Sequence, residues 1–460
     1  MRGGVNRGIG LGFFMPTEHL FGLGEREDTL RLSRTTNATA YEMWAFDSPH
    51  VPDFKNGLYG NQPFVEGIGK ESAQAITWVN SAHTWVFLDD ATYQGEKGSH
   101  INFVSETGAL ELFIFSSSLP VGKGNGDLNR NARIQYALGT VTGFAPMPPM
   151  HTLGFMFSKY DVVSSDIVRA RNKNFTDTQF PVDVFFFDIQ WADNYTAADG
   201  YEYFRFNPQN FTKDGLAKMN SEVESSGRFI TTILDPHIKK SEDYFVYSEG
   251  LSLEKDSDVN SIFVKDATGK VDFSGTCWPG ESVWIDFLNE NARAYWATRY
   301  DYEKFKGSTH IYHAWNDMNE PSVFSEESKT IPTTAKHRRA NGEMVEHREF
   351  HNAYGATQQS WSYKGLLWRD NHRRRPFILT RSFFLGSQKF SAYWTGDNCA
   401  TDENEPWGAM KMVIQNGLGG MIFGGADIPG FLGNPSQEMW IRGYQMGMYM
   451  PVFRAHSDIS

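Results

Sequence analysis

The segment HIYHAWNDMNEPSVF, residues 310–324, begins with apolar and aromatic residues and then becomes acidic. Its first part, residues 310–317, is short and contains Ile, Tyr and Trp, which favours a buried β-strand. Asp317 stands at the end of that run. Acidic side chains usually lie in water, so a carboxylate at the end of a buried strand needs a specific explanation.

Seven other runs of this kind alternate with helix-length segments. They lie at 152–158, 182–188, 228–235, 376–381, 390–397, 419–427 and 450–456. Near-continuous apolar runs are typical of parallel strands that are covered on both faces. Because eight such strands close a barrel, we predict the α/β fold class, with a (β/α)8 TIM barrel over residues 146–460 that ends just after its eighth strand.

The first 145 residues have a different pattern. Short β-like pieces, such as TWVFLD (84–89) and HINFVS (100–105), are separated by Gly and Asn, and helical periodicity is weak. We predict a partial β-sandwich-like domain over residues 1–145. Within the barrel, two long connections, at about 236–285 and 321–350, are expected to be insertions that shape a site at the mouth.

Charge and hydropathy exclude two classes of partner. The formal net charge of -12 argues against nucleic acid and anionic membranes, because both require clustered Lys and Arg. The short basic runs at 336–340 and 372–376 are interpreted as surface or ion-paired residues. No apolar stretch reaches the roughly 18 residues of a membrane span.

Few sequence features bear on the cellular compartment. Two cysteines, Cys277 and Cys399, give neither a disulfide framework nor a metal-ligand spacing. The N-terminus shows no complete signal-peptide core. Four N-x-[ST] sequons would suit a secretory-pathway protein. They lie at Asn37, Asn174, Asn194 and Asn210.

The predicted barrel strands share a polar ending. The residues at these ends are Asp188, Asp235, Asp317, Arg381, Asp397, Asp427 and His456. In a TIM barrel the C-terminal ends of the strands surround one mouth, where active sites lie. A single Asp there could simply cap the next helix. Seven converging polar side chains predict an active site instead.

Two kinds of chemistry fit such a mouth. Metal-assisted hydrolysis would use clustered His and carboxylate ligands, but the nearest candidate, HREFH at 347–351, lacks the HExxH order, so we predict no metal and no cofactor. Glycoside hydrolysis needs two carboxyl groups, one protonated and one ionised. Asp317 and Asp397 end the fourth and sixth strands, and Arg381 between them would keep one carboxylate charged. Aromatic rings would carry the sugar. The candidate rings are Trp278, Trp315, Trp394 and Phe431.

Several segments together resemble glycoside hydrolase family 31, the retaining α-glucosidases and their relatives. WNDMNEPSVF resembles the nucleophile segment, ILTRSFFLGSQKFSAYWTGDN (378–398) the arginine and acid/base block, and FGGADIPGF (423–431) and FRAH (453–456) the seventh and eighth strand blocks. CWPG, ILDPHI and FFFDI match further segments. The resemblance spans nearly the whole barrel, in the order that the family has.

This resemblance implies roles for individual residues. Asp317 would be the nucleophile and Asp397 the general acid/base of a double displacement with net retention. Glu320 would support the structure around them. The implied substrate-binding residues are Asp47, Asp188, Ile189, Ile233, Trp278, Trp315, Met318, Arg381, Trp394, Asp427, Phe431 and His456.

Within the family, EHREFHNAYG (346–355) most resembles the endoplasmic-reticulum members that trim α-1,3-linked glucose from N-linked glycans and pair with a non-catalytic β subunit. The expected function is therefore a retaining, exo-acting α-glucosidase of the endoplasmic reticulum lumen. FGLGERED (21–28) has a form common elsewhere in the family, so an α-1,4-glucosidase, an α-xylosidase and a non-catalytic glycan-binding scaffold stay open. Compared with the family, the chain looks truncated at both ends, and we expect it to be poorly stable alone.

Overall fold

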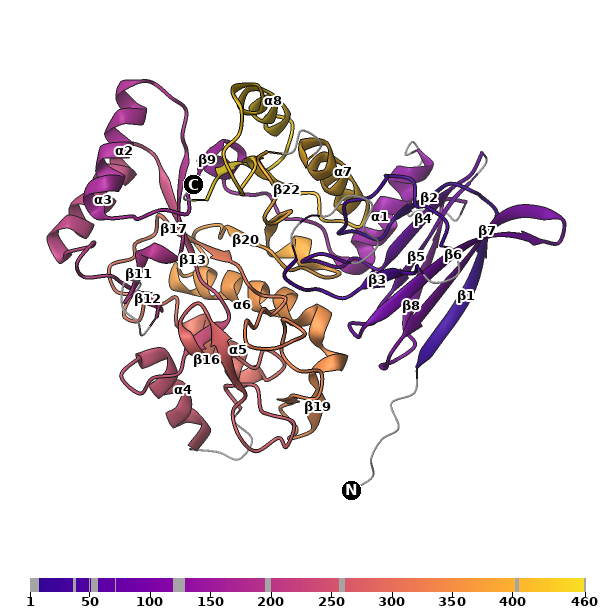
Figure 1. The fold of residues 1–460 in the computed structure, drawn as a ribbon, viewed down its shortest axis with the longest axis horizontal. Helices are drawn as coiled ribbons and strands as arrows, with labels where there is room; N and C mark the ends of the chain where they lie inside the picture. Colours follow the sequence, from indigo (N-terminus) through magenta and orange to yellow (C-terminus); the bar gives the residue numbers. More distant parts are fainter. Residues whose placement is uncertain are drawn as a thin grey trace.

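The computed structural model describes residues 8–458, except 36–38, 49, 51–56, 71, 119–128, 195–199, 256–260 and 402–404. A ring of short parallel strands forms its centre (Figure 1). In chain order these strands are β9 (Phe155–Phe157), β10 (Val184–Phe187), β13 (Phe229–Ile233), β17 (Tyr312–Asn316), β20 (Ile378–Thr380), β21 (Ala392–Trp394), β22 (Gly424–Gly425), β23 (Asp427–Pro429) and β24 (Phe453–His456).

The ring closes through the seventh strand. Strand β22 pairs with β21, while β23 pairs with β24, and only Ala426 separates β22 from β23. Strand β24 in turn pairs with β9. The two short pieces act as one strand, so the predicted eight-stranded parallel barrel is confirmed.

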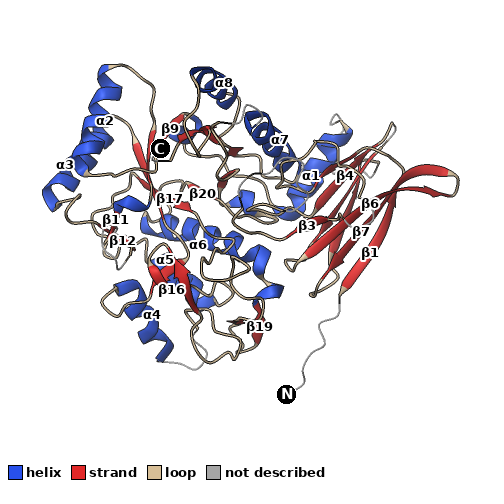
Figure 2. Ribbon diagram, in the orientation of Figure 1, coloured by secondary structure: helices blue, strands red, loops and turns tan. Residues whose placement is uncertain are grey.

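Helices surround the barrel on its outside (Figure 2). Four of them begin at a Ser, Thr or Asn side chain that accepts a backbone N–H of the first turn: Ser164, Thr212, Asn289 and Ser436. The helices after the barrel strands are α2 (Ser165–Asp177), α3 (Lys213–Ser225), α5 (Glu290–Thr298), α6 (Tyr354–Arg369), α7 (Glu405–Leu418) and α8 (Gln437–Gly447). No helix in the described part of the chain is long and apolar enough to cross a membrane.

The barrel strands are shorter than the apolar runs that predicted them. The first run starts with a 3-10 helix, Met150–Leu153, and the seventh strand begins at Gly424, five residues after the predicted start at Gly419. Gly420 in that stretch has a φ of 104°, which a strand does not accommodate. Several polar residues therefore stand beyond the strand ends: Asp317 directly follows β17, whereas Asp397 comes three residues after β21. Asp427, predicted at the end of its strand, is instead the first residue of β23, which continues to Pro429.

Two antiparallel sheets form the N-terminal part, beside the barrel (Figure 1). Side chains of both sheets share one core, which includes Val86 and Phe103 from the first and Val65 and Trp78 from the second. This face-to-face packing confirms the predicted sandwich. The first sheet holds β1 (Ile9–Met15), β7 (Glu96–Ser105), β6 (Thr84–Tyr93) and β3 (Tyr41–Met43), and the second β2 (Leu20–Gly22), β4 (Phe64–Ile68), β5 (Ala73–Trp78) and β8 (Leu112–Ser116).

One helix of this region was not predicted. Helix α1 (Arg130–Thr142) buries only Ile134 and Leu138, which pack against the second sheet. Two buried residues in 13 produce little apolar periodicity, which explains why the sequence pattern did not reveal it.

The insertions have structure of their own. The first holds β14 (His237–Lys239), α4 (Phe245–Lys255), β15 (Ser274–Cys277) and β16 (Gly280–Trp284). The second holds the hairpin β18 (Lys336–Arg338) and β19 (Met344–Glu346). A third, unpredicted hairpin follows the second barrel strand, with β11 (Ala192–Asp193) and β12 (Glu202–Phe206).

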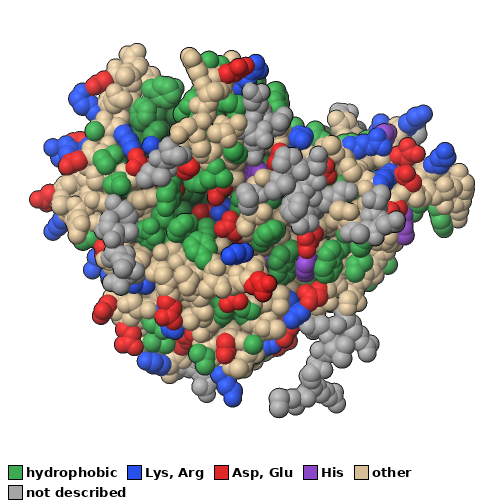
Figure 3. Space-filling model, in the orientation of Figure 1, with side chains coloured by type: hydrophobic (Ala, Val, Ile, Leu, Met, Phe, Trp, Pro, Cys, Tyr) green, Lys and Arg blue, Asp and Glu red, His purple; other side chains and the backbone are tan. Residues whose placement is uncertain are grey.

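Charged side chains of both signs share the surface. On the face in Figure 3, Lys and Arg side chains are scattered among Asp and Glu, and hydrophobic side chains gather near the centre.

Of the sequons, Asn37 lies outside the described residues, Asn174 is exposed on α2, and Asn194 and Asn210 are half-buried.

Candidate active site

A cavity of about 310 Å³ opens at the C-terminal ends of the barrel strands. It is lined by 14 residues, of which 12 were predicted from the sequence. The predicted ones are Asp47, Asp188, Ile189, Ile233, Trp278, Trp315, Asp317, Met318, Arg381, Asp397, Phe431 and His456. The structure thus brings residues from the N-terminal domain, the barrel strands and the first insertion to one place.

Asp317 is held by Arg381. The Nε atom of Arg381 lies 3.0 Å from Asp317 Oδ1, and both side chains are largely buried. Burial raises the pKa of Asp317, and the Arg381 cation offsets part of that rise. Since the guanidinium contacts the carboxylate directly, it favours the ionised form that a nucleophile requires.

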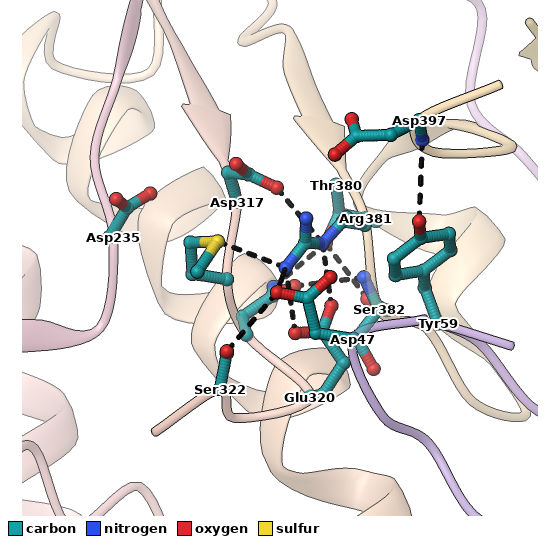
Figure 4. A network of polar contacts seen from close by, with 12 residues as sticks. Asp47, Tyr59, Asp235, Asp317, Glu320, Ser322, Thr380, Arg381, Ser382 and Asp397 are labelled. Carbon is teal, nitrogen blue, oxygen red and sulfur yellow. Dashed lines mark hydrogen bonds and ion pairs between the residues drawn. The ribbon is translucent and has the colours of Figure 1, made fainter. Parts of the chain in front are cut away.

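Glu320 binds the same guanidinium and shares its Nε atom with Asp317. Its two oxygens accept from Arg381 Nε at 2.8 Å and Nη2 at 2.9 Å, which is a bidentate pair. Glu320 does not line the cavity. This placement agrees with the supporting role expected for it. Figure 4 shows Asp317, Glu320 and Asp47 gathered around Arg381.

Local sequence explains how the Asp317 segment is fixed. Met318 adopts a left-handed conformation with a φ of 54°, and its sulfur accepts from Arg381 Nη2 at 3.0 Å. Asn319 donates to Thr380 Oγ1 at 3.0 Å and accepts from the N–H of Ser382 at 2.8 Å. The polar residues of WNDMNEP therefore tie the end of β17 to the end of β20.

Asp397 approaches from the far side of Arg381 (Figure 4). It follows Gly396, whose φ of 82° is left-handed and whose Cα lies against the Tyr59 ring. The Asp397 N–H donates to Tyr59 Oη at 3.4 Å. Burial, opposed by Arg381 and reinforced by Asp317, raises the pKa of Asp397 to about 7. A carboxyl group with that pKa is still protonated in part at neutral pH, as a general acid must be.

Another acid of the cavity, Asp188, lies near His456. Asp188 Oδ1 accepts the N–H of Ile189 at 2.7 Å, and Asp188 Oδ2 lies 3.5 Å from His456 Nε2. Burial raises the pKa of Asp188 to about 8 and holds the pKa of His456 well below its usual value. Neutral Asp and His side chains both donate and accept hydrogen bonds, which suits sugar hydroxyls.

Two predicted site residues do not line the cavity. Trp394 is buried behind Trp315, with ring centroids 5.4 Å apart. Asp427 is fully buried and lies 3.3 Å from Arg454 Nη2. Arg454, which the sequence reasoning missed, contacts the Trp315 ring at 4.4 Å from its centroid. Both residues therefore form the layer below the cavity wall, because the barrel interior is filled by packed side chains.

Two lining residues were not predicted. Tyr160 lies two residues after the first predicted strand, and its ring meets the edge of Phe431 at 6.5 Å. Asp458 follows the eighth strand by two residues. The rule that found the other acids, a polar residue just past a strand end, would have found Asp458 had it been extended by two residues. The same extension would also have found Tyr160, whose side chain carries a phenolic hydroxyl.

Aromatic rings line the cavity at two depths. Trp315 is buried, and its ring meets His456 edge-on at 5.4 Å. Trp278 is 38% exposed and stands perpendicular to Phe324 at 5.0 Å. The first can contact a sugar inside the cavity, whereas the second is available to a group at its entrance. Among the described residues no cluster of three His, Cys, Asp or Glu side chains could hold a metal ion.

A closed eight-stranded α/β barrel with paired acids in one mouth cavity is an arrangement typical of TIM-barrel glycoside hydrolases. The chain belongs to glycosyl hydrolase family 31. The family's TIM-barrel domain model matches residues 145–460, and the model of its N-terminal galactose mutarotase-like domain matches residues 13–86.

Relatives and solved structures agree with this membership. The chain is 34% identical to neutral alpha-glucosidase AB of Dictyostelium discoideum, over 98% of this chain and 45% of that protein. It is 34% identical to a probable glucan 1,3-alpha-glucosidase of Oryza sativa subsp. japonica, over 96% of this chain and 46% of that protein. The chain therefore spans just under half the length of these relatives.

A crystal structure of ER glucosidase II, a complex of the catalytic subunit with the binding domain of the regulatory subunit, superposes with a TM-score of 0.87 at 34% identity. That match covers 98% of this chain and 48% of that one. The glucosidase II alpha subunit bound to alpha3-Glc2 also has a TM-score of 0.87, at 33% identity, with 98% and 47% covered.

Proposed function

We propose that this chain carries the active site of a retaining, exo-acting α-glucosidase. The observation that carries the proposal is the pair of unlike acids in one cavity: Asp317 contacts the Arg381 cation, and Asp397 is buried with its pKa raised to about 7. Burial raises the pKa of both carboxyl groups, but of the two it is Asp317 that contacts the Arg381 cation, which favours the ionised form that a nucleophile needs and leaves Asp397 as the acid.

In the first step, the Asp397 carboxyl proton passes to the glycosidic oxygen while an Asp317 carboxylate oxygen bonds to the anomeric carbon. The bond to the leaving group breaks, and the leaving group departs as an alcohol. In the second step, the Asp397 carboxylate takes a proton from water, and the resulting hydroxide bonds to the anomeric carbon as Asp317 leaves. Two inversions give net retention, and neither step requires a cofactor.

The remaining lining residues would bind the terminal sugar. Asp188 and His456 offer hydrogen bonds to hydroxyl groups, and Arg381 holds the nucleophile in place. Trp315 and Phe431 offer ring faces, while Ile189 and Ile233 close the wall. A cavity of about 310 Å³ lies at the small end of ligand pockets, which favours release of one terminal sugar over cleavage within a chain.

For the substrate, we propose α-1,3-linked glucose on N-linked glycans. The names of the relatives support this choice, because they include a probable glucan 1,3-alpha-glucosidase and ER glucosidase II. The same comparisons lead us to propose a regulatory, non-catalytic subunit as a partner and the endoplasmic reticulum lumen as the compartment.

Rates of hydrolysis of α-1,3- and α-1,4-linked glucose disaccharides and of an aryl α-xyloside test the proposal. We expect the highest kcat/KM on the α-1,3-linked disaccharide, with α-glucose as the first product seen by NMR. A preference for the α-1,4 linkage or the xyloside would assign another specificity in the family. Glycan binding without turnover of any of them would identify a non-catalytic scaffold.

A further inference from the structure

The HREFH segment takes part in a chain of hydrogen bonds away from the cavity. Asp286 Oδ1 lies 2.7 Å from His337 Nδ1, and His337 Nε2 lies 2.9 Å from His347 Nδ1. His347 Nε2 lies 2.8 Å from His351 Nδ1, and His351 Nε2 lies 2.6 Å from the carbonyl oxygen of Ala45. All four side chains are fully buried. The nitrogens point along a line rather than toward one point, which a metal site would require.

Both ends of this chain are hydrogen-bond acceptors. The Ala45 carbonyl cannot donate, so His351 Nε2, His347 Nε2 and His337 Nε2 must each carry a proton for their contacts to be hydrogen bonds. Three neutral imidazoles have no further N–H protons. The contact between His337 Nδ1 and Asp286 Oδ1 then needs a fourth proton.

The fourth proton belongs at the Asp286 end. Asp286 Oδ1 and His337 Nδ1 form the one contact that the three ring N–H groups leave without a donor, and Asp286 also accepts the N–H groups of Arg338 at 2.8 Å and Leu288 at 3.1 Å. Burial lowers the pKa of His351 to about 3 and that of His347 well below its usual value, so neither ring is suited to a second proton. The fourth proton therefore lies between Asp286 Oδ1 and His337 Nδ1.

The other end of the chain positions a segment of the cavity wall. Ala45 is fixed at both backbone groups, because its N–H donates to Asn352 Oδ1 at 2.9 Å while its carbonyl accepts from His351. Two residues later, Asp47 lies 3.5 Å from Arg381 Nη2 and 3.3 Å from Ser322 Oγ. The histidine chain therefore connects a barrel insertion to the N-terminal segment that carries Asp47, which lines the cavity.

We propose that the four residues of this chain are positioning residues that hold Asp47 at the cavity: Asp286, His337, His347 and His351. Their four hydrogen bonds contain four protons, one more than the three N–H protons that three neutral imidazoles supply. When the chain loses that proton at high pH, two lone pairs face each other at one contact, and the link from Asp286 to Ala45 is broken. The effect on substrate binding rests on the proposed function, whereas the proton count does not.

Other ionisable groups face this chain and must be held constant in a test. Arg293 on α5 and Tyr354 on α6 interact with Asp286, and His83 beside β6 interacts with His351. His83 itself contacts Glu42 on β3 at 2.5 Å. A comparison of variants that differ only at Asp286 leaves all of them unchanged.

Neutron diffraction from deuterium-exchanged crystals near pH 7 tests the proton count directly on the unmodified chain. We expect deuterium in all four contacts, from Asp286 to Ala45. Three deuterium atoms, with one contact empty, would overturn the proposal whatever the catalytic activity.

Glucoside binding tests the positioning role. The Asp397→Asn variant provides a background in which methyl α-glucoside, whose alcohol leaving group needs the missing acid, binds with its turnover strongly slowed, and in which the Asp397 titration is absent. In that background, Asp286→Asn supplies an amide N–H to His337 Nδ1, so three neutral imidazoles complete the chain at any pH. His100→Asn, at an exposed histidine on β7, is the matched control.

We expect the single Asp397→Asn variant to lose roughly threefold to tenfold more affinity between pH 7 and pH 9 than the Asp397→Asn/Asp286→Asn double variant, because one hydrogen bond is lost. Adding His100→Asn should leave the loss unchanged. Equal pH dependence in the single and double variants, with equal melting temperatures, would overturn the positioning role. Absence of glucoside binding in every variant would reject the proposed function, and the neutron map would still decide the proton count.

Discussion

Arg381 and Asp317 form the central ion pair of the site, with Arg381 Nε 3.0 Å from Asp317 Oδ1. The same guanidinium binds Glu320 with two hydrogen bonds and lies 3.5 Å from Asp47. Burial acts to lower the pKa of Arg381, but these three carboxylates raise it well above its usual value. One buried cation thus serves three acids, of which only Asp317 and Asp47 line the cavity.

Removing this cation should destabilise the protein. Arg381→Met leaves Asp317 and Glu320 buried without a counter-ion, and breaking a buried pair in this way costs about 3–5 kcal/mol. Chemical denaturation measures the loss, which should shrink at acidic pH as the two acids become protonated. Arg381→Lys keeps the charge but not the bidentate geometry, so its stability should lie between that of Arg381→Met and that of the unmodified chain. Stability of Arg381→Met equal to that of the unmodified chain would contradict this account.

The pH dependence of kcat/KM should report Asp397. Its pKa is raised to about 7, and the protonated form is the acid, so kcat/KM should fall as pH rises through about 7. Asp397→Asn should remove this fall and lower kcat by about 10²–10⁴ for an alcohol leaving group. For a glucosyl fluoride, whose fluoride leaves without protonation, kcat/KM should be affected much less, because Asp397 is then needed only as the base of the second step. Asp166→Asn, at an exposed acid on α2, is the control.

Glu25 should make stability depend on pH. It is fully buried between the N–H of Gly60 and the side-chain amide of Asn416, and burial raises its pKa from 4.5 to about 8. A raised carboxyl pKa gives stability that is fully present at low pH and is lost as pH rises through about 8. Glu25→Gln removes that loss, so the variant should gain stability over the unmodified chain at pH 8 and little at pH 5. The gain has an upper bound of about 1.4 kcal/mol per pKa unit. Glu438→Gln, on the surface of α8, should show no such gain.

Trp278 should affect long substrates more than short ones. Because it is 38% exposed at the cavity entrance, its ring can contact the sugar beyond the terminal one. Trp278→Ala should raise KM for a disaccharide or glycan by a factor equivalent to about 1 kcal/mol and leave KM for a glucosyl fluoride, which has no group beyond the terminal sugar, nearly unchanged. Trp440→Ala, an exposed ring on α8, is the control. An equal rise in KM for both substrates would place Trp278 against the terminal sugar instead.

The barrel could be predicted because its strands are covered on both faces and leave near-continuous apolar runs. Asp188, Asp317 and Arg381 were found by the same pattern, since each directly follows its strand. Asp397 stands three residues past β21, beyond a left-handed glycine, and the family resemblance rather than periodicity gave its role.

Other features depend on tertiary contacts that leave no local signal. Helix α1 buries two residues, so its pattern is weak. Asp427 was predicted from the strand-end pattern and Trp394 as a ring that carries the sugar, yet both lie behind the cavity wall, because alternate residues of a barrel strand face the packed interior. The histidine chain joins residues 286, 337, 347 and 351 to residue 45, and no spacing in the sequence indicates that contact.

The most direct test of the account is identification of the residue that bonds to the sugar. A 5-fluoro-α-glucosyl fluoride should react at the first step and hydrolyse slowly, so the covalent adduct accumulates and peptide mass spectrometry can locate it. We predict one labelled carboxylate, Asp317, with no label in Asp317→Asn. A label on Glu320 or Asp397, or turnover with inversion and no covalent adduct, would contradict the assignment of Asp317 as the nucleophile.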